Sequence, residues 1–531
     1  VAARLALACS RERLIDATLE HGALRLGRGP TLPLSRVRAL ELHTPELTAD
    51  RDPLLEDPLA LWHALAPTLG LAPAVIERVA SELADGAHNL ALALVAVHWR
   101  RRLADRDPHD ARVCDGEHVV VEGHPWHPMT KTRLGLRTSE VLRHAPEWLA
   151  DVPLVAVDVP RALARTSGPW IETVAPIVGH PPAGLVRIPV HLAQWRRIAG
   201  VADLAAPLTN RGPVARARAL LSVRTVAVPG SPLHLKLALD VHTTSARRIV
   251  SPMSVANGAP VTALLERIAA RDPVARGEPA LVVLGERAAA GLDPTAFGDA
   301  ARQLGAIARD AHELARAPAM VCAALGDRWP DGTRGLERLA ARGPGDPRER
   351  ATTLVHAYIG GLVPPVLRML VAHGVALEVH LQNTLVRSDG RCGLRFVVRD
   401  LGGIRLHRGR LAAAGHEITL DPASFITTDD LDELVGKLAH TLVHAHMAAF
   451  FGWVHDAFGV AEAEGWAALR ATIAALLQRW SAEPGLAAAC AHDRAALFAR
   501  RCRAKALLSM RIHDRSSDYD WVELDNPLAE A

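Results

Sequence analysis

Basic side chains are concentrated in residues 122–135, which read Glu-Gly-His-Pro-Trp-His-Pro-Met-Thr-Lys-Thr-Arg-Leu-Gly. The segment carries His124, Lys131 and Arg133 around two prolines. Because proline fixes its own φ, these groups are held on a restrained backbone. A phosphate chain needs convergent N–H donors, and a rigid basic loop provides them at low entropic cost. For any single residue the alternative is a surface turn with solvated charges.

A second polar group follows in a part of the sequence that is rich in β-forming residues. Ser-Val-Arg-Thr at residues 222–225 is followed by Lys236 and by Thr-Thr-Ser-Ala-Arg-Arg at residues 243–248. Alternate residues of a strand share a face, so Ser222 and Arg224 should point into one cleft. The fork of arginine suits a carboxylate, whereas Lys236 suits a phosphate as a point charge. We expect a basic trough on neighbouring strands; a solvent-facing sheet surface is the plainer alternative.

A third group combines acidic, amide and imidazole side chains. Glu378, His380 and Gln382 alternate along the chain and should share one face of a strand. Asn383 follows directly, and Asp400 precedes two glycines. An amide and a carboxylate on two strands of a hairpin are the ligands with which kinase-like enzymes hold magnesium. For His380 alone, a core histidine satisfied by hydrogen bonds is the alternative.

Three regions that differ in their hydrophobic pattern must position these side chains. Helical periodicity runs from about residue 4 to residue 102. Short β-rich runs separated by Pro and Gly follow, and beyond residue 274 helical periodicity returns. Residues 376–386 and 394–404 interrupt it as a hairpin across Ser388-Asp389-Gly390. We expect an α+β chain with a helical N-terminal domain (1–110), a β-rich middle domain (111–268) and a mostly helical C-terminal domain containing the hairpin (269–531).

Composition restricts the kind of protein. With 61 basic and 58 acidic residues the formal net charge is +3, which excludes the global field that binding to nucleic acid or a membrane surface requires. The 6 cysteines contain no C-x-x-C pair, which argues against a zinc site and a disulfide framework. No uninterrupted apolar run reaches about 18 residues, the length of a spanning helix. We expect a cytoplasmic protein without a membrane anchor.

Together these motifs resemble those of one family. His-Pro-Trp-His-Pro-x-x-Lys-x-Arg, Ser-Val-Arg-Thr, Lys-Leu with Thr-Ser-Ala-x-Arg, Glu-x-His-x-Gln-Asn and Arg-Asp with its glycines occur in the order and approximate spacing of the aerobactin-synthetase (IucA/IucC-like) family. These are siderophore synthetases that work without a peptide-synthetase template. The resemblance runs from about Glu82 to Leu528. One departure is His-Leu-Ala-Gln at residues 191–194, where the family usually shows His-Pro-Trp-Gln.

The resemblance implies a three-domain cupped hand, with a helical thumb, β-rich fingers and a larger palm around a cleft where ATP and a carboxylate meet. It assigns Arg248 and His380 to catalysis and to carboxylate binding. The other implied roles are grouped by ligand. The ATP contacts are His124, Lys131, Ser222, Arg224, Thr225, Lys236, Gln382 and Asp400. The remaining substrate contacts are Thr244 and Ser245, and the magnesium ligands are Glu378, Asn383 and Asp400.

The implied activity is an ATP-dependent ligase that adenylates a carboxylate, citrate or a citrate derivative, and passes the acyl group to an amine, hydroxylamine or alcohol. The products are AMP and pyrophosphate. A small-molecule kinase is the second hypothesis, favoured by Asn383 and Asp400, although neither a Gly-rich phosphate loop nor a His-Arg-Asp loop is present. A non-catalytic binding protein for iron chelates is the third. Assembly as a homodimer is left open.

Overall fold

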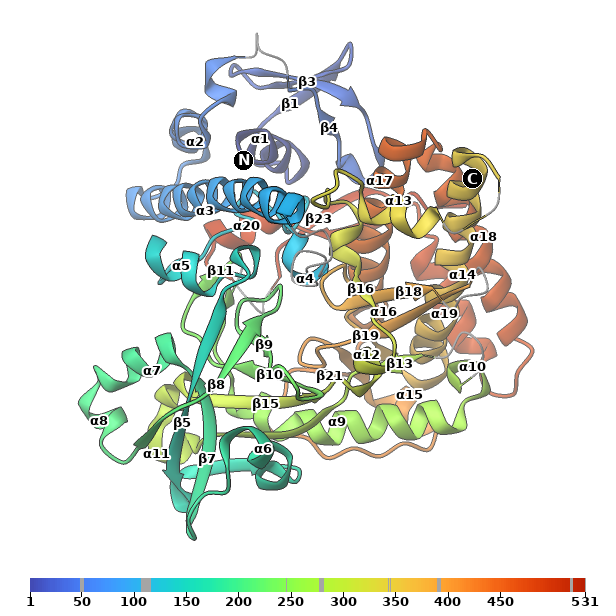
Figure 1. Cartoon of the computed structure of the whole chain (residues 1–531). Coiled ribbons are helices and arrows are strands. Elements are labelled where there is room, and N and C mark those ends of the chain that lie inside the picture. The colour runs from blue at the N-terminus through green and yellow to red at the C-terminus, as the bar shows by residue number, and fades with distance from the viewer. Residues whose placement is uncertain are drawn as a thin grey trace.

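The structure is a computed structural model, and it describes residues 1–47, 52–106, 116–244, 246–276, 281–341, 343, 345–388, 393–515 and 519–530. Helices and sheets are both abundant, and they gather in three regions (Figure 1). A small N-terminal region lies at the top of the view, a large sheet at the lower left, and a helix-rich C-terminal region at the right. The mixed α+β class is confirmed.

The N-terminal region contains a sheet that the sequence reading did not anticipate. Four strands pair in the order β1-β2-β3-β4, so the expectation of helix throughout residues 4–102 is wrong for residues 17–45. Leu24, Leu26, Leu32 and Leu34 are buried at alternate positions, a period of two that favours strands. The strands are β1 (Ala17–Glu20), β2 (Ala23–Leu26), β3 (Thr31–Arg36) and β4 (Thr44–Pro45). The helices are α1 (Ala2–Arg11), η1 (Ala39–Glu41), η2 (Pro53–Leu55), α2 (Pro58–Leu65), η3 (Ala66–Leu69) and α3 (Pro73–Arg106).

The middle region is built on an eight-stranded sheet with the order β6-β14-β15-β10-β9-β8-β5-β7, in which each strand is antiparallel to its neighbours. The sheet extends past the predicted boundary at residue 268, because β14 and β15 complete it. Its strands are β5 (Asp151–Pro160), β6 (Ala164–Ser167), β7 (Leu185–His191), β8 (Thr209–Ala219), β9 (Thr225–Ala227), β10 (Leu233–Leu237), β14 (Glu286–Leu292) and β15 (Gly305–Asp310). A separate pair joins β11 (His242–Thr243) and β12 (Ala246–Arg247).

Short helices flank this sheet. Although residues 119–121 are all valine, a residue that favours strands, Val119 ends the helix α4. These helices are α4 (Gly116–Val119), α5 (Thr138–His144), η4 (Pro146–Trp148), η5 (Arg161–Leu163), α6 (Trp170–Val178), α7 (Leu192–Ala199), α8 (Ala202–Ala205), α9 (Pro252–Arg271), α10 (Pro273–Arg276), α11 (Pro294–Phe297), η6 (Gly298–Gln303) and α12 (His312–Arg316).

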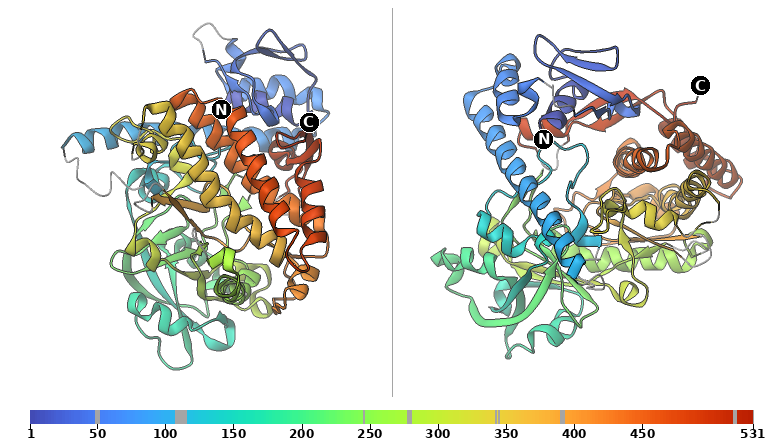
Figure 2. Two further views of the ribbon diagram at one scale, coloured as in Figure 1. Left: turned by 90° about the vertical axis from the view of Figure 1, so that its right-hand side faces the viewer. Right: turned by 45° about the horizontal axis from the view of Figure 1, so that its top comes forward.

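The C-terminal region surrounds one long helix, α14 (Pro347–His373). Asp346 caps its first turn together with Glu349, and Gly374 ends it in the left-handed conformation. By length and composition α14 could span a membrane, but 78% of its most apolar window is buried inside the protein, where it packs against α18 and β19 (Figure 2). Its apolar surface is therefore core surface.

The other helices of this region are η7 (Cys322–Leu325), α13 (Gly335–Ala340), α15 (Arg408–Ala413), α16 (Leu431–Leu438), the π-helix η8 (Ala439–Met447), α17 (Ala448–Phe458), α18 (Glu462–Trp480), α19 (Ala487–Leu497) and α20 (Leu507–Ile512). Three small sheets accompany them. Their strands are β13 (Val282–Val283), β16 (Met320–Val321), β17 (Val375–Ala376), β18 (Thr384–Ser388), β19 (Leu394–Val398), β20 (Arg405–His407), β21 (Thr427–Thr428), β22 (Arg501–Lys505) and β23 (Trp521–Asp525). The predicted hairpin is β18 with β19; its turn residues 389 and 390 lie outside the described residues.

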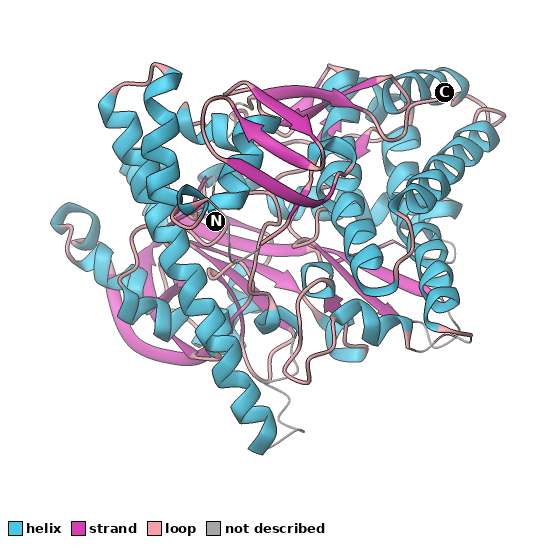
Figure 3. Ribbon diagram, turned by 90° about the horizontal axis from the view of Figure 1, so that it is seen from above, coloured by secondary structure: helices cyan, strands magenta, loops and turns pink. Residues whose placement is uncertain are grey.

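The small N-terminal sheet lies in front of the helices when the molecule is seen from above (Figure 3), and α20, close to the end of the sequence, packs against α1 in the same region. Glu12 accepts hydrogen bonds from the backbone amides of Leu508 and Ser509 at 2.9 and 2.7 Å. Glu82 on α3 and Arg511 on α20 form two hydrogen bonds of 2.8 and 2.6 Å, and each side chain is only 2% exposed. The C-terminal helix is thereby locked to the N-terminal region.

Replacing Glu82 by alanine should lower the free energy of unfolding by about 3–5 kcal/mol, because the buried guanidinium of Arg511 loses its buried carboxylate and keeps only the exposed Asp514 at 3.2 Å. Urea unfolding followed by circular dichroism measures the loss. Glu77 lies exposed on the same helix, so Glu77→Ala serves as the control and should change stability by less than about 0.5 kcal/mol. Equal small effects of the two variants would show that the pair is not what holds α20.

Candidate active site

One cavity of about 360 Å³ brings the three predicted polar groups together. Eight of the predicted residues line it, namely His124, Lys131, Ser222, Thr244, Arg248, Glu378, His380 and Gln382. Five others are not among its lining residues: Arg224, Thr225, Lys236, Asn383 and Asp400. Ser245 lies outside the described residues. Residues more than 250 positions apart in the sequence therefore share one cavity.

The loop at residues 122–135 is closed on itself. Thr130 donates its hydroxyl hydrogen to the carbonyl of Glu122 at 2.8 Å. Gly123 has φ +66°, and a Cβ there would stand 2.6 Å from the Thr130 hydroxyl, so glycine is required. The backbone amide of Trp126 donates to Nδ1 of His124 at 3.3 Å. Burial lowers the pKa of His124 to about 3, so the imidazole that lines the cavity is uncharged at pH 7.

Lys131 is neutralised by a carboxylate that sequence reasoning did not single out as a partner. Its ammonium is bound to Glu147 and donates to the carbonyl of Val120 at 3.1 Å. Arg133 donates to both oxygens of Glu147 at 2.7 and 2.9 Å. Burial alone would raise the pKa of Glu147, but the two cations hold it well below its usual range. Lys131 therefore lines the cavity as one member of a buried ion network with Glu147 and Arg133.

Residues 222–225 lie in a tight turn rather than on one strand, so the expected alternation of Ser222 and Arg224 on a strand is wrong. The turn joins β8 to β9, and Val223 adopts φ +66° within it. Ser222 donates to the hydroxyl of Thr225 at 2.8 Å and accepts from its amide at 3.1 Å. The prolines and glycines that mark most turns are absent here, which is why the pattern was read as a strand.

Asp400 is the centre of a cluster of cations. It follows β19, adopts φ +69°, and lies 2.6 Å from the ammonium of Lys236 and 3.6 Å from Arg309. Burial would raise its pKa, but Lys236 and Arg309 hold it well below the usual range. Arg309 also bonds Glu286 at 3.1 Å. Lys236 is opposite Thr225 in the β9–β10 pair. A lysine of the middle sheet therefore pairs with a carboxylate that follows the C-terminal hairpin.

Glu378 is held by a second lysine. The ammonium of Lys437 lies 2.6 Å from Oε1 of Glu378, and the amide of Asn383 donates to Oε2 at 3.4 Å. Although burial opposes it, Lys437 with His380 lowers the pKa of Glu378 to about 2. A Cβ on Gly403 would clash with this carboxylate, which explains the second glycine after Asp400.

The third group faces the cavity as expected, though not because it forms a strand. Glu378, His380 and Gln382 all line the cavity, but residues 377–383 lie between β17 and β18. Asn383 immediately precedes β18, and Asp400 comes two residues after β19. Because Thr384 is paired with Val398, Asn383 and Asp400 lie at the same end of the hairpin. Their predicted proximity is confirmed.

The β11–β12 turn presents two neighbouring arginines in opposite directions. Arg248 lines the cavity and is held by the hydroxyls of Thr243 and Thr244, the second at 3.4 Å. Arg247 points away and makes two bonds of 2.9 and 2.6 Å to Asp240. Extended backbone accounts for the alternation. Only Arg248 is placed to meet a ligand in this cavity.

Two cations of the site were not assigned a role from the sequence, although a compositional signal was available. The chain has only four lysines: Lys131 and Lys505 line this cavity, Lys437 binds its Glu378, and Lys236 binds Asp400 after the hairpin. The ammonium of Lys505 stands 3.4 Å from the ring centroid of Tyr519. Burial and the neighbouring Lys437 lower the pKa of Lys505 to about 7. In a chain whose cations are nearly all arginine, the rare lysines mark the site.

The carboxylates of the site are limited in number. Within the described ranges no group of three or more His, Cys, Asp or Glu is arranged to hold a metal ion. Magnesium is commonly held by one or two carboxylates together with substrate phosphates. Glu378 and Asp400 are both held in the ionised form, and Asn383 lies at the same end of the hairpin as Asp400. These residues fit a magnesium site of that kind.

A chain of mixed helix and sheet with a cation-lined cavity is thus the class that fold and site define. Residues 112–327 match the model of the IucA / IucC family, and residues 352–520 match that of the ferric iron reductase FhuF-like transporter family. The expected resemblance to the IucA / IucC family is thus confirmed for residues 112–327.

Named relatives agree with this assignment. Staphyloferrin A synthase of Staphylococcus aureus (strain NCTC 8325 / PS 47) is 29% identical over 461 residues, which cover 81% of this chain and 75% of that protein. D-ornithine–citrate ligase of the same strain is 22% identical over 460 residues, covering 78% and 69%. ATP-bound aerobactin synthetase IucA of Klebsiella pneumoniae shares the fold, with a TM-score of 0.79, 18% identity and coverage of 100% and 99%.

The lysines allow a direct electrostatic measurement. After reductive methylation with ¹³C-formaldehyde, the dimethyl-lysine signal that disappears in Lys505→Met should titrate near pH 7, because the buried cavity disfavours its charged form. Addition of ATP should raise that pKa, since a triphosphate favours the ammonium. A Lys505 signal that titrates near 10 and ignores ATP would contradict the placement of this lysine in an anion-binding cavity.

Proposed function

We propose that the chain is an ATP-dependent siderophore synthetase that adenylates citrate and condenses it with an amine, hydroxylamine or alcohol. The observation that carries this is the convergence of the three polar groups on one cavity, which Lys131 and Lys505 line and whose Glu378 is bound by Lys437. A relative named as a D-ornithine–citrate ligase supports the choice of citrate. We place the reaction in the cytoplasm, where ATP is supplied, and its product in iron acquisition.

Adenylation solves a leaving-group problem. A carboxylate does not acylate an amine at neutral pH, because oxide would have to leave. In the proposed reaction a citrate carboxylate oxygen attacks the α-phosphorus of ATP, and pyrophosphate departs. The nucleophile then attacks the acyl carbon, its bond to that carbon forms, and the acyl–oxygen bond to AMP breaks. Fixed cations around the phosphates stabilise the charge that develops, the kind of preorganised electrostatics that contributes most to catalysis.

The residues divide these tasks by their chemistry. Arg248 offers a planar fork for a citrate carboxylate and holds it for attack. Burial lowers the pKa of His380, so its imidazole is neutral at pH 7 and can accept the proton lost by the nucleophile. Lys236 and Lys505 supply point charges for phosphate oxygens. His124, Lys131, Ser222, Arg224, Thr225, Gln382 and Asp400 complete the proposed ATP site, and Thr244 and Ser245 the proposed citrate site.

Magnesium would be held by Glu378, Asn383 and Asp400, and when bound it would neutralise charge on the ATP phosphates. Both carboxylates are ionised at neutral pH, as ligation requires. Lys236 and Lys437 hold the two side chains in position.

The three regions fit a cupped hand in which the N-terminal region is the thumb, the sheet is the fingers and the C-terminal region is the palm. We extend the fingers to about residue 310, since β15 ends there. Assembly as a homodimer remains part of the proposal. A kinase is not favoured, because the relatives are ligases and synthases.

Purified protein supplied with ATP, magnesium and citrate should release AMP and pyrophosphate once an amine is added. Anion-exchange chromatography of the nucleotides measures this directly. ADP as the only nucleotide product would instead identify a kinase, and no turnover would favour a binding protein.

Arg248→Lys should lower kcat/KM for citrate about ten- to a hundredfold, since loss of charge-assisted bonds costs about 1.5–3 kcal/mol. The KM for ATP should barely change. Citrate-dependent ATP–pyrophosphate exchange measures both constants. Arg247→Lys is the control: Arg247 faces away from the cavity and should leave exchange unaffected. A loss at Arg248 confined to the KM for ATP would contradict the carboxylate assignment.

A further inference from the structure

The segment at residues 377–383 carries three side chains of the cavity, yet it lies between β17 and β18 rather than in a strand. Glu378, His380 and Gln382 line the cavity, whereas the side chains of Leu377 and Val379 are fully buried in the core. Because the pairing of a strand does not account for this alternation, other contacts must hold the backbone of the segment.

The π-helix η8 supplies two of these contacts. Nδ1 of His446 donates to the carbonyl of Val379 at 2.7 Å, and the hydroxyl of Thr441 donates to the carbonyl of Leu377 at 3.3 Å. The carbonyl of Leu381 accepts from a backbone amide of η7 at 3.0 Å. Alternate carbonyls of the segment are thus each held by a hydrogen bond, and the bond from His446 is the shortest.

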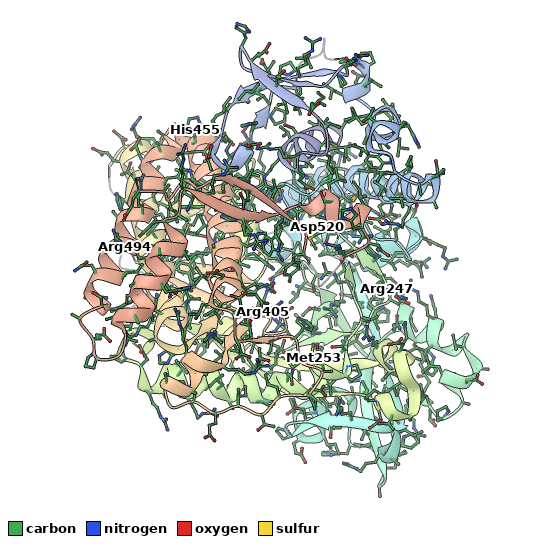
Figure 4. The ribbon with its side chains drawn as sticks, turned by 180° about the vertical axis from the view of Figure 1, so that it is seen from behind. Arg247, Met253, Arg405, His455, Arg494 and Asp520 are labelled. Atoms are coloured by element: carbon green, nitrogen blue, oxygen red, sulfur yellow. The ribbon has the colours of Figure 1, made fainter. Side chains whose placement is uncertain are left out.

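The geometry of a π-helix explains why two side chains of η8 reach the same segment. Residues five apart in an α-helix lie about 140° apart around its axis, so Thr441 and His446 would face different directions. In η8 the turn is wider, and the amide of Ala448 donates to the carbonyl of Val443, five residues earlier. Such turns are rare and occur frequently at functional sites. Figure 4, seen from behind, labels His455 on α17, the helix into which η8 continues.

The imidazole of His446 is fixed in one protonation state and one orientation. Burial lowers its pKa to about 4, so the ring carries a single proton at pH 7. A carbonyl can only accept, so this proton is on Nδ1, and Nε2 accepts from the hydroxyl of Tyr358 at 2.6 Å. The ring of Tyr358 is stacked on Phe450 with 3.9 Å between centroids. The long helix α14, which carries Tyr358, therefore sets the direction in which His446 donates.

We propose that His446 is a positioning residue for the reaction, and that its bond to the Val379 carbonyl keeps the neighbouring side chains of Glu378 and His380 directed into the cavity. The inference rests on the proposed function. His446 is fully buried and is not among the residues that line the cavity, so it acts through the backbone of Val379. The peptide cannot turn these two side chains away without breaking that bond.

A burst of pyrophosphate, measured by rapid mixing with ATP, magnesium and citrate without a nucleophile, separates positioning from folding. The rate constant of the burst reports the arrangement of the site, and its amplitude reports the fraction of folded, active chains. His446→Leu should lower the rate constant about ten- to a hundredfold and leave the amplitude unchanged, as removal of partners that orient site ligands typically does. His446→Asn should recover most of the rate, because its amide donor takes nearly the place of Nδ1.

Hydrogen–deuterium exchange gives a second readout that does not depend on turnover. The peptide covering residues 377–383 should exchange faster in His446→Leu than in the wild type, because its backbone has lost the bond at Val379. Exchange at the wild-type rate would show that His446 does not hold this segment.

His444→Leu is the matched control. His444 is buried in the same π-helix, its Nδ1 has no hydrogen-bond partner among the described residues, and it does not line the cavity. This variant should leave both the burst and the exchange of residues 377–383 unchanged. If His446→Leu does not fold, Tyr358→Phe takes its place, because it keeps the ring and removes only the hydroxyl that places the proton on Nδ1. It should slow the burst about two- to tenfold.

A wild-type protein that releases no pyrophosphate would defeat the proposed function, and this inference with it. Where the wild type does show the burst, the positioning role is overturned if His446→Leu keeps the wild-type rate constant, or if His446→Asn or His444→Leu is as slow as His446→Leu. Where Tyr358→Phe has to be used, a wild-type rate in that variant overturns it. In each of these cases the adenylation proposal stands.

Discussion

A carboxylate removed from water keeps its charge only when cations lie close by, and the cavity depends on two such carboxylates. Asp400 is ionised because Lys236 and Arg309 surround it, and Glu378 because Lys437 lies at 2.6 Å. Each pair joins segments far apart in the sequence. The middle sheet supplies Lys236, the hairpin region supplies both carboxylates, and α16 supplies Lys437. These ion pairs therefore also fix the positions of the regions relative to one another, because breaking one pair leaves a buried ion without its partner.

The same principle closes the site from the other side. Glu82 and Arg511 fix α20 to α3, and α20 with the preceding strand carries Lys505 and Met510 into the cavity. The N-terminal helix α3 and the C-terminal helix α20 are thus needed together to complete the wall. Stability and substrate positioning are consequently coupled through one buried ion pair.

Sequence patterns predicted much of this arrangement, and where they failed the cause is physical. Types and spacing of residues identified His124, Arg248, Glu378, His380 and Gln382, which do share a cavity. Their neighbours Ser222 and Arg224 were placed on a strand, whereas a positive φ at Val223 creates a turn without proline or glycine. The small N-terminal sheet was missed because its strands are short and stand between strongly periodic helices. Glu147 and Arg309 could not be found, since their role follows from which cations burial brings near them.

The central claim is that one preorganised, lysine-marked cavity holds ATP and citrate side by side. A crystal structure of the protein with citrate and a non-hydrolysable ATP analogue tests it most directly. The account predicts triphosphate oxygens against Lys236 and Lys505, and a citrate carboxylate on Arg248 facing the α-phosphorus. A nucleotide bound outside this cavity, away from Lys505 and Arg248, would contradict it.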